Sequence, residues 1–345
     1  MTKTAVVLMN LGGPDSDAAV EPFLFNLFSD PAIIALPNPL RWLIAKLISR
    51  QRGPVARAIY AKIGSASPLL PNTEAQARAL EQALGAETRC FIAMRYWLPR
   101  AEEAAHAVKE WGADRVVLLP LYPQFSSTTT ASSLKDWQRA AAAVRLAVPT
   151  RALCCYPTEA GFIAALAANI RQALDGWPKT LAAPRILLSA HGLPKRTVAR
   201  GDPYEAQIAQ TASQLRQALD LSIVDSVVCY QSRVGPLDWL GPATDAEIRR
   251  AGAEKKGLIV APIAFVSEHS ETLVELDIEY RHLAEASGVP HYVRVPTVSA
   301  AAPFIAGLAS LVRQALTAAS DRPWPDGGQS HCPGRFGFCP LQAAR

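Results

Sequence analysis

The chain alternates short, continuously apolar runs with longer amphipathic segments. The short runs are rich in Val, Ile and Leu without alternating polar residues, which is typical of strands that are buried on both faces. The longer segments are rich in Ala and carry apolar residues at helical spacing. Strands separated by helical crossovers predict an α/β fold with parallel sheets. The strand candidates span 4–10, 89–96, 114–122, 151–156, 185–191, 225–232, 257–265 and 291–296, and the helix candidates span 73–84, 101–112, 159–177, 204–219 and 244–252.

The order of these elements repeats along the chain. Residues 115–134, RVVLLPLYPQFSSTTTASSL, resemble residues 257–276, GLIVAPIAFVSEHSETLVEL, and the turn LMNLGGP resembles the turn LLSAHGLP. The repeat predicts two similar Rossmann-like, doubly wound parallel-sheet domains with an active-site cleft between them. The expected parts are an N-terminal domain over 1–122 with an insertion at 21–71, a C-terminal domain over 123–300, and a helix with a Cys-containing tail over 301–345.

Composition and charge exclude several classes of protein. The 345 residues carry a formal net charge of +5 without the Lys/Arg clusters of a nucleic-acid-binding surface, so we expect no nucleic-acid partner. The start resembles no secretory signal, because its apolar run is short and ends in a Gly-Gly-Pro turn. No apolar run is long enough to span a bilayer. Six cysteines are too few for a disulfide scaffold, which favours a cytoplasmic protein.

The insertion at 21–71 is apolar and is interrupted by prolines. Two interpretations of it stay open. It is either a helical insertion packed on the body of its domain, or an apolar lip at a cleft or at an anionic membrane surface. Apolar and cationic side chains act together at such surfaces. The basic residues along the insertion include Arg41, Lys46, Arg50 and Arg52.

Polar residues follow several predicted strands at their carboxyl ends, where ligands bind in open parallel sheets. His191 ends the strand at 185–191, and Glu268 and Glu271 follow the strand at 257–265. A histidine in such a place is either a structural hydrogen-bonding residue or a group that exchanges protons near neutral pH and binds metal. The residues alone leave both interpretations open.

The stretch from 268 to 279 gathers carboxylates in a basic chain. On a helix that begins near Glu268, four of them fall on one face: Glu268, Glu271, Glu275 and Glu279. One interpretation is a solvated helix face. The other is an inward line of carboxylates, because apolar residues are interleaved with them. Burial of carboxylates is costly, so an inward line predicts proton conduction or binding of a divalent cation.

The chain lacks the motifs GxxxxGK[ST], GxGxxG, GxSxG and HExxH. It carries instead VLMNLGGPDS, FLFNLFSDP, LYPQFSSTTTASS, LLSAHGLP, RGDPY, YQSRVGPLDWLGPATD and PIAFVSEHSETLVELDIEY, which extend over most of its length. Through these motifs the chain resembles the ferrochelatases of bacterial type, the terminal enzymes of haem synthesis. The resemblance implies an enzyme that inserts Fe²⁺ into protoporphyrin IX and releases two protons.

The resemblance also implies roles for individual residues. His191 would be the proton acceptor or metal handler, with Glu271 as its catalytic partner. Glu268 and Glu275 would join this pair as metal-binding residues. Together with His269 they would extend a polar line from Glu271 toward solvent. The implied porphyrin-binding residues are Leu11, Trp239 and Phe265 as apolar walls, Tyr60, Ser67, Arg95 and Tyr122 as polar contacts, and Arg52 as a propionate contact.

Some ferrochelatases carry a [2Fe–2S] cluster on a Cys-rich C-terminal tail and an internal cysteine. Animal members take the internal ligand from the Tyr-Pro-Gln loop, where this chain has Ser127, while the tail here reads SHCPGRFGFCP. The other interpretation is that the internal cysteines are buried apolar residues. A cluster needs four ligands, and the candidates are Cys154, Cys155, Cys332 and Cys339, with His331, Cys90 and Cys229 as alternatives for the fourth.

Three functions stay open at this level. They are a ferrochelatase for protoporphyrin IX, a chelatase for another tetrapyrrole such as coproporphyrin III, and a porphyrin- or haem-binding protein without catalysis. The presence of both His191 and Glu271 favours catalysis. The expected partners are protoporphyrin IX and ferrous iron. We also expect a monomer or homodimer in the cytoplasm, with peripheral contact at the cytoplasmic face of the inner membrane.

Overall fold

The computed structural model describes residues 2–220, 225–233, 235–318, 324–325, 332 and 336–340. The chain divides into two units. The first comprises Met1–Cys155 and Leu308–Pro325, and the second comprises Tyr156–Gly307 and Asp326–Arg345. The first unit thus extends past the boundary expected after residue 122, because strand β4 (Thr150–Cys155) still pairs with β3 (Arg115–Pro120).

Each unit contains one parallel sheet. In the first unit the order is β2-β1-β3-β4-β9, and in the second it is β6-β5-β7-β8. In both sheets the first strand of the unit lies between the second and the third, and the fourth follows the third. The predicted α/β class with two similar doubly wound sheets is therefore confirmed. The strands not yet given are β1 (Thr4–Asn10), β2 (Thr88–Met94), β5 (Arg185–His191), β6 (Ser226–Gln231), β7 (Leu258–Pro262), β8 (Tyr292–Arg294) and β9 (Trp324–Pro325).

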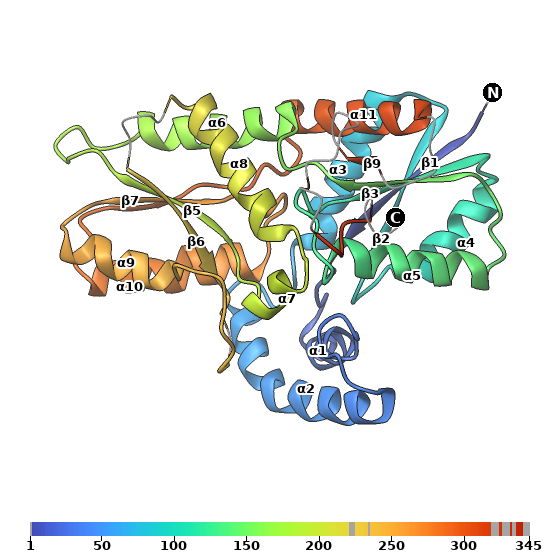
Figure 1. Ribbon diagram of the computed structural model, residues 1–345, viewed down its shortest axis with the longest axis horizontal. Coiled ribbons are helices and arrows are strands. Elements are labelled where there is room, and N and C mark those ends of the chain that lie inside the picture. Colours follow the sequence, from blue (N-terminus) through green and yellow to red (C-terminus); the bar gives the residue numbers. More distant parts are fainter. Residues whose placement is uncertain are drawn as a thin grey trace. The chain divides into compact units, whose positions relative to one another are not determined.

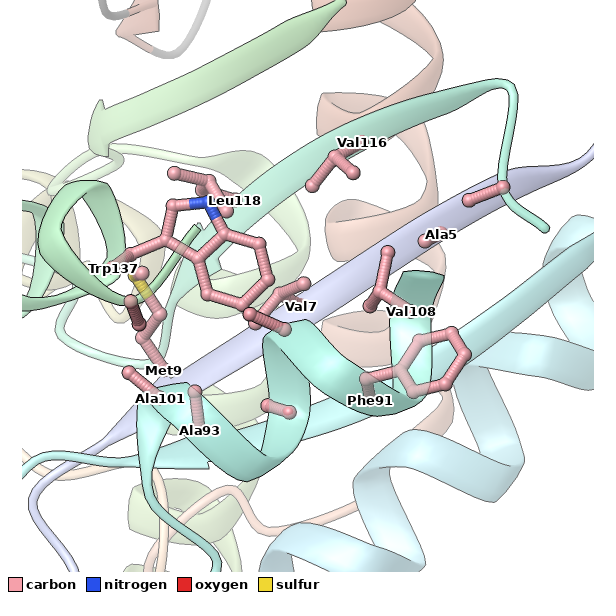
Figure 2. Close-up of a cluster of buried hydrophobic side chains, with 14 residues drawn as sticks. Ala5, Val7, Met9, Phe91, Ala93, Ala101, Val108, Val116, Leu118 and Trp137 are labelled. Carbon is pink, nitrogen blue, oxygen red and sulfur yellow. The ribbon is translucent and has the colours of Figure 1, made fainter. Parts of the chain in front are cut away.

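Helices cover both faces of the first sheet. Strand residues alternate between faces, so Val7 and Met9 of β1 point to the face that α4 (Ala101–Trp111) and α5 (Thr130–Ala143) cover. Figure 2 shows this cluster, in which Trp137 of α5 lies over strand residues of the sheet. Helix α3 (Leu69–Leu84) lies on the other face. Its Thr73 accepts a hydrogen bond from Asn10 of β1, and its Ala83 accepts one from Arg313 of α11 (Ala302–Thr317).

The predicted insertion forms two helices, α1 (Val20–Phe28) and α2 (Asn38–Ala61), which pack against each other. The 3₁₀ turn η1 (Asp17–Ala19) precedes them. One side of the pair is a buried cluster, with Tyr60 and Tyr96 among its members. The other side of α2 is apolar and exposed, since Leu40, Leu43 and Leu47 are 50%, 52% and 58% exposed. Among the described residues, no helix is both long and apolar enough to cross a bilayer.

The second sheet is also covered on both faces (Figure 1). Side chains of α9 (Thr244–Ala253), η2 (Glu271–Glu279) and α10 (Tyr280–Ala286) form one buried cluster with Leu187 of β5 and Val260 of β7. Helices α6 (Ala160–Asp175) and α8 (Tyr204–Ala218) cover the opposite face. The short helix α7 (Lys195–Ala199) follows β5.

Candidate functional site

The site in the second unit is built on the carboxyl end of β5. Strand alternation puts Leu187, Ser189 and His191 on one face, and Leu187 packs against the cluster that includes η2. His191 therefore faces η2, where Nδ1 of its ring lies 2.8 Å from Oε2 of Glu271. The resemblance named these two residues as a catalytic pair, and the structure brings them together.

The turn after His191 depends on a glycine. The amide of Gly192 donates to the carbonyl of Gln231 at the end of β6, at 2.8 Å. A Cβ on residue 192 would stand 2.8 Å from the same carbonyl oxygen, closer than real Cβ contacts allow. Only glycine lets the two strand ends approach this closely, which keeps His191 beside Gln231.

The helix that carries Glu271 is a π-helix over Glu271–Glu279. We predicted a helix that begins near Glu268. The observed helix begins within three residues of that position, but its π-helical type was not predicted. Side chains bond to carbonyls along η2: Gln231 donates to the carbonyl of Glu271 at 3.0 Å, and Tyr292 donates to that of Leu276 at 2.6 Å. π-Helical turns are rare and frequent at functional sites.

His269 and Phe265 surround the pair. Nε2 of His269 lies 3.5 Å from Oε2 of Glu271, so this carboxylate faces two imidazoles. The Phe265 ring centroid is 4.7 Å from the His269 ring and 6.5 Å from the His191 ring. Phe265 is thus an apolar group in contact with the rings of His191 and His269.

Glu275 lies one turn further along η2 and is held by several donors. Its carboxylate accepts from the amide of Ser232 at 2.7 Å, from Gln231 at 3.1 Å and from Tyr280 at 3.0 Å. The Ser232 hydroxyl also donates to it, at 2.5 Å. Gln231 links the strand ends as well, because it accepts from Ser189 of β5 at 2.9 Å. Glu279, at the end of η2, is exposed.

These contacts shift the pKa values in opposite directions. Burial lowers the pKa of His191, but the charge and hydrogen bond of Glu271 more than offset it, so this pKa lies above its usual value of 6.5. Burial raises the pKa of Glu271, but His191 and then His269 bring it well below its usual range. Burial and the charge of Glu271 raise the pKa of Glu275. The pair is therefore an ionised carboxylate beside an imidazole of increased basicity.

Glu268 has different partners from those expected. Its carboxylate accepts from Arg294 of β8 at 2.6 Å, from the amide of Thr297 at 3.0 Å and from the Thr272 hydroxyl at 2.5 Å. It precedes η2 in the chain and is engaged by a guanidinium. Among the described residues, no group of three or more His, Cys, Asp or Glu side chains is arranged to hold a metal ion.

Two aromatic residues, Trp239 and Tyr204, contact the end of β5 or the turn that follows it. Trp239 pairs with Pro194 in an isolated antiparallel bridge, next to the turn that follows His191. The hydroxyl of Tyr204, at the start of α8, donates to the carbonyl of His191 at 3.1 Å. Sequence reasoning missed Tyr204, Gln231 and Arg294. The motif RGDPY contains Tyr204 and was the one signal that could have indicated it.

In the first unit, Arg95 lies at the end of β2 within a polar network. Its guanidinium donates to the buried Asp30 at 2.8 Å and to Ser132 at 2.7 Å, and it lies 4.9 Å from the Tyr96 ring centroid. The hydroxyl of Tyr96 donates to the same Asp30 carboxylate, at 2.8 Å. Arg95 is therefore anchored by a carboxylate of its own unit. Tyr122 comes shortly after the end of β3, and burial raises the pKa of its hydroxyl.

The remaining expected porphyrin contacts of this unit lie around its first turn and on α2. Leu11 packs on the buried cluster that contains Tyr60. Ser67 lies against Gly13, where a Cβ would meet its hydroxyl at 2.4 Å, and its amide donates to the carbonyl of Pro14. Arg52 is exposed on α2. The structure thus brings Leu11 and Tyr60 into one cluster.

The candidate cluster ligands are all buried. Cys154 and Cys155, at the end of β4 in the first unit, have sulfur atoms 3.4 Å apart. In the second unit, Cys332 and Cys339 are 8% and 2% exposed. Gln207 of α8 donates to the sulfur of Cys332 at 3.2 Å. His331, an alternative ligand, lies outside the described residues.

Known ferrochelatases are similar to this chain along almost its whole length. The model of the Ferrochelatase family matches residues 3–316. The chain is 54% identical to a ferrochelatase of Phenylobacterium zucineum, covering 98% of this chain and 97% of the relative. It is 52% identical to one of Caulobacter vibrioides, covering 97% and 98%, and 44% identical to one of Pelagibacter ubique, covering 98% of each.

Solved structures support the same fold. The sirohydrochlorin chelatase SirB from Bacillus subtilis subspecies spizizenii, in complex with cobalt, aligns with a TM-score of 0.56 at 10% identity, over 91% of this chain and 95% of that one. SirB from Bacillus subtilis with Fe³⁺ aligns with a TM-score of 0.52 at 12% identity, over 92% and 96%. At such identities the likeness concerns the fold alone. By the family match and by close relatives along almost its whole length, the chain belongs to the ferrochelatase family.

Proposed function

We propose that this chain inserts Fe²⁺ into protoporphyrin IX, giving protohaem and two protons, in the last step of haem biosynthesis. The observation that carries the proposal is the pairing of Nδ1 of His191 with Oε2 of Glu271 at 2.8 Å. The names of the relatives support the same activity. Metal insertion requires a proton acceptor, and the carboxyl end of a parallel strand is where ligands bind in open sheets.

The chemistry sets the task of the pair. A free-base porphyrin carries two pyrrole N–H groups, and both protons must leave as iron enters. Because Nδ1 of His191 faces an ionised Glu271, the other ring nitrogen is the one that can accept a proton from the substrate. The raised basicity of His191 favours this transfer. Glu271 then stabilises the imidazolium that forms.

The residues proposed to bind the iron substrate include the same pair. We propose that iron, as substrate, meets His191 and Glu271, and that Glu275 extends the polar line along η2. The gradient of exposure supports this order, since Glu271 and Glu275 are partly buried while Glu279 is exposed. Glu268, the other expected metal-binding residue, is left out of this line because its carboxylate accepts a hydrogen bond from Arg294.

The porphyrin contacts stay those that the family resemblance implies. Phe265 and Trp239 in the second unit, and Leu11 in the first, would serve as apolar walls. Tyr60, Ser67, Arg95, Tyr122 and Arg52 would serve as polar contacts. The contact of Phe265 with both imidazoles supports its part in this set. Arg95 would bind substrate while it stays paired with Asp30.

The test is anaerobic incubation of the protein with Fe²⁺ and one porphyrin at a time. Protoporphyrin IX and coproporphyrin III are compared by following the Soret and Q bands. We expect the bands of protohaem to form with protoporphyrin IX. Faster turnover of coproporphyrin III would assign another tetrapyrrole, and binding of porphyrin without metal insertion would leave a binding protein.

We also propose that α2 contacts the cytoplasmic face of the inner membrane, with the protein otherwise in the cytoplasm as a monomer or homodimer. The exposed leucines Leu40, Leu43 and Leu47 recur at helical spacing, and Arg50 and Arg52 lie on the same helix, both exposed. Apolar side chains beside cations suit an anionic lipid surface.

The [2Fe–2S] cluster is a separate proposal. The thiols of Cys332 and Cys339 are buried on the tail. Cys154 and Cys155, whose sulfur atoms lie 3.4 Å from each other, would supply two further ligands. Thiolate sulfur is the ligand that such clusters use. When bound, the cluster would stabilise the fold rather than take part in metal insertion.

A further inference from the structure

Arg294 joins two parts of the chain that flank the catalytic carboxylate. Its side chain is 10% exposed. Nη1 donates to Glu268 at 2.6 Å, while Nη2 and Nε donate to Asp277 at 3.0 and 3.3 Å. Glu268 precedes η2, and Asp277 lies near its end. One planar guanidinium therefore fixes β8 to both ends of the π-helix that carries Glu271.

Thr272 connects Glu268 to the turn that carries His269 and Glu271. It is fully buried, and its hydroxyl donates to Oε2 of Glu268 at 2.5 Å. The hydroxyl oxygen of Thr272 in turn accepts from the amide of His269 at 3.0 Å. The turn that presents His269 and Glu271 is thus held by a path from Arg294 through Glu268 to Thr272.

The same contacts bear on the role of Glu268. Its carboxylate already has a guanidinium, a backbone amide and a hydroxyl as partners. A metal ion at this carboxylate would compete with Arg294 for it, whereas the ion pairs of Glu271 within the described part of the chain are with the imidazoles of His191 and His269. The geometry favours Glu268 as an anchor.

We infer that Arg294 is a positioning residue for metal insertion, acting through Glu268 to hold the turn that presents His269 and Glu271. The inference rests on the proposed function. Arg294 contacts neither His191 nor Glu271 in the hydrogen bonds described, so its effect is on their placement. Small misplacements of catalytic groups have large effects on rate, about 10²-fold for about 1 Å.

The test compares Arg294→Gln, Glu268→Gln and the double variant. We expect Arg294→Gln to lower kcat by about 10²-fold with an unchanged KM for porphyrin and for Fe²⁺. The double variant should be no worse than the poorer single variant, because both changes break one contact. If Glu268 were a metal ligand, Glu268→Gln would raise the KM for Fe²⁺, and the two effects would multiply, which would overturn the inference.

Arg281→Gln is the matched control. Arg281 donates to Asp277 at 2.7 Å, as Arg294 does, but its described contacts do not include Glu268. We expect the kcat of Arg281→Gln to stay within about 3-fold of wild type, since partly exposed ion pairs such as Arg281–Asp277 contribute little to stability. A loss equal to that of Arg294→Gln would place the effect at Asp277 and reject the path through Glu268.

Amide hydrogen exchange of peptides that cover residues 266–276 gives a second readout, independent of catalysis. Arg294→Gln and the double variant should speed exchange there, while Arg281→Gln should not. Exchange that is unchanged in Arg294→Gln would overturn the inference even if turnover fell. If wild-type protein inserted no iron, the proposed function would fail, and the exchange data would still decide whether Arg294 holds the turn.

Discussion

Nδ1 of His191 lies 2.8 Å from Oε2 of Glu271, although 80 positions separate them in the sequence. The strand end of β5 supplies the imidazole, and the first residue of η2 supplies the carboxylate. The ionised Glu271 keeps one ring nitrogen of His191 occupied and leaves the other for the substrate.

His191→Ala should abolish metal insertion and leave porphyrin binding within about 3-fold of wild type. The reason is that the imidazole takes the proton, while the binding contacts are carried by other side chains. Turnover is measured by the Soret band and binding by quenching of porphyrin fluorescence. Turnover equal to that of wild type would remove His191 from the mechanism.

Glu271→Gln should lower turnover by about 10²–10⁴-fold, because an amide can neither carry a proton nor stabilise an imidazolium. Glu279→Gln is the control, since Glu279 is exposed at the far end of the same helix. It should stay within about 3-fold of wild type. Equal losses in both variants would contradict the gradient of importance along η2.

The pair should also contribute to stability within a pH window. Because the folded pKa of His191 is raised, its contribution is present below its usual 6.5 and is lost as pH rises through the folded value. Because the pKa of Glu271 is lowered, its contribution is present above its usual 4.5 and is lost as pH falls. Glu271→Gln should therefore lower the melting temperature most between about pH 4.5 and the folded pKa of His191, and less above it.

Glu110→Gln is the control for this pH series, because it breaks the ion pair between Glu110 and His106. The side chains of His106 and Glu110 are 64% and 74% exposed. Exposed pairs contribute little, so this variant should follow the wild-type melting curve at each pH. A melting difference for Glu271→Gln that is the same at pH 6 and pH 9 would contradict the coupling of His191 to Glu271. Glu271→Gln also removes the charge that raises the pKa of Glu275, whereas Glu110→Gln does not.

Replacing Leu40, Leu43 and Leu47 together by Glu should abolish binding to membranes. We expect wild-type protein to sediment in part with vesicles of anionic lipid at low salt, through the exposed face of α2 and its arginines. Leu237→Glu, an exposed leucine outside α2, should sediment like wild type. Wild-type protein that stays in the supernatant at low salt would leave α2 as a gate for substrate.

If Cys332 and Cys339 bind a [2Fe–2S] cluster, protein purified without oxygen should be brown. It should carry about two iron atoms and two inorganic sulfides per chain. Cys332→Ser should remove the colour and lower the melting temperature, because cluster binding is linked to folding. Cys90→Ser should keep the colour if the fourth ligand lies elsewhere. Colourless protein without sulfide after reconstitution would defeat the proposal.

Much of the fold could be predicted because parallel strands that are buried on both faces have a distinctive composition. All eight predicted strands are present, as β1 to β8. β9 could not be predicted, since it is the two-residue strand Trp324–Pro325 in a Pro/Gly-rich tail. The prolines in 21–71 suggested a broken segment, but α2 continues through Pro54 as one helix. Packing against α1 outweighs the local cost of that proline.

The site could be predicted only in part. His191 and Glu271 stand at a strand end and just after a strand, and such positions can be located from the sequence. The contact between Glu268 and Arg294 could not, because it joins residues 26 apart through the geometry of β8 and the turn. The π-helix was missed as well, since its carbonyls bond to side chains such as Gln231, which lies 40 residues from Glu271.

The pairing of β9 with β4 sets an order of events during synthesis. About 170 residues separate Cys155 of β4 from its partner Pro325 of β9. At translation rates of about 5–20 residues per second, that interval lasts about 10–30 s. The whole second sheet emerges within it, while the edge of β4 still presents unpaired backbone groups that other chains can bind. The N-terminal unit, although it is started first, is therefore completed only after the second sheet has emerged, and the nascent chain is exposed to misassembly at that edge throughout the interval.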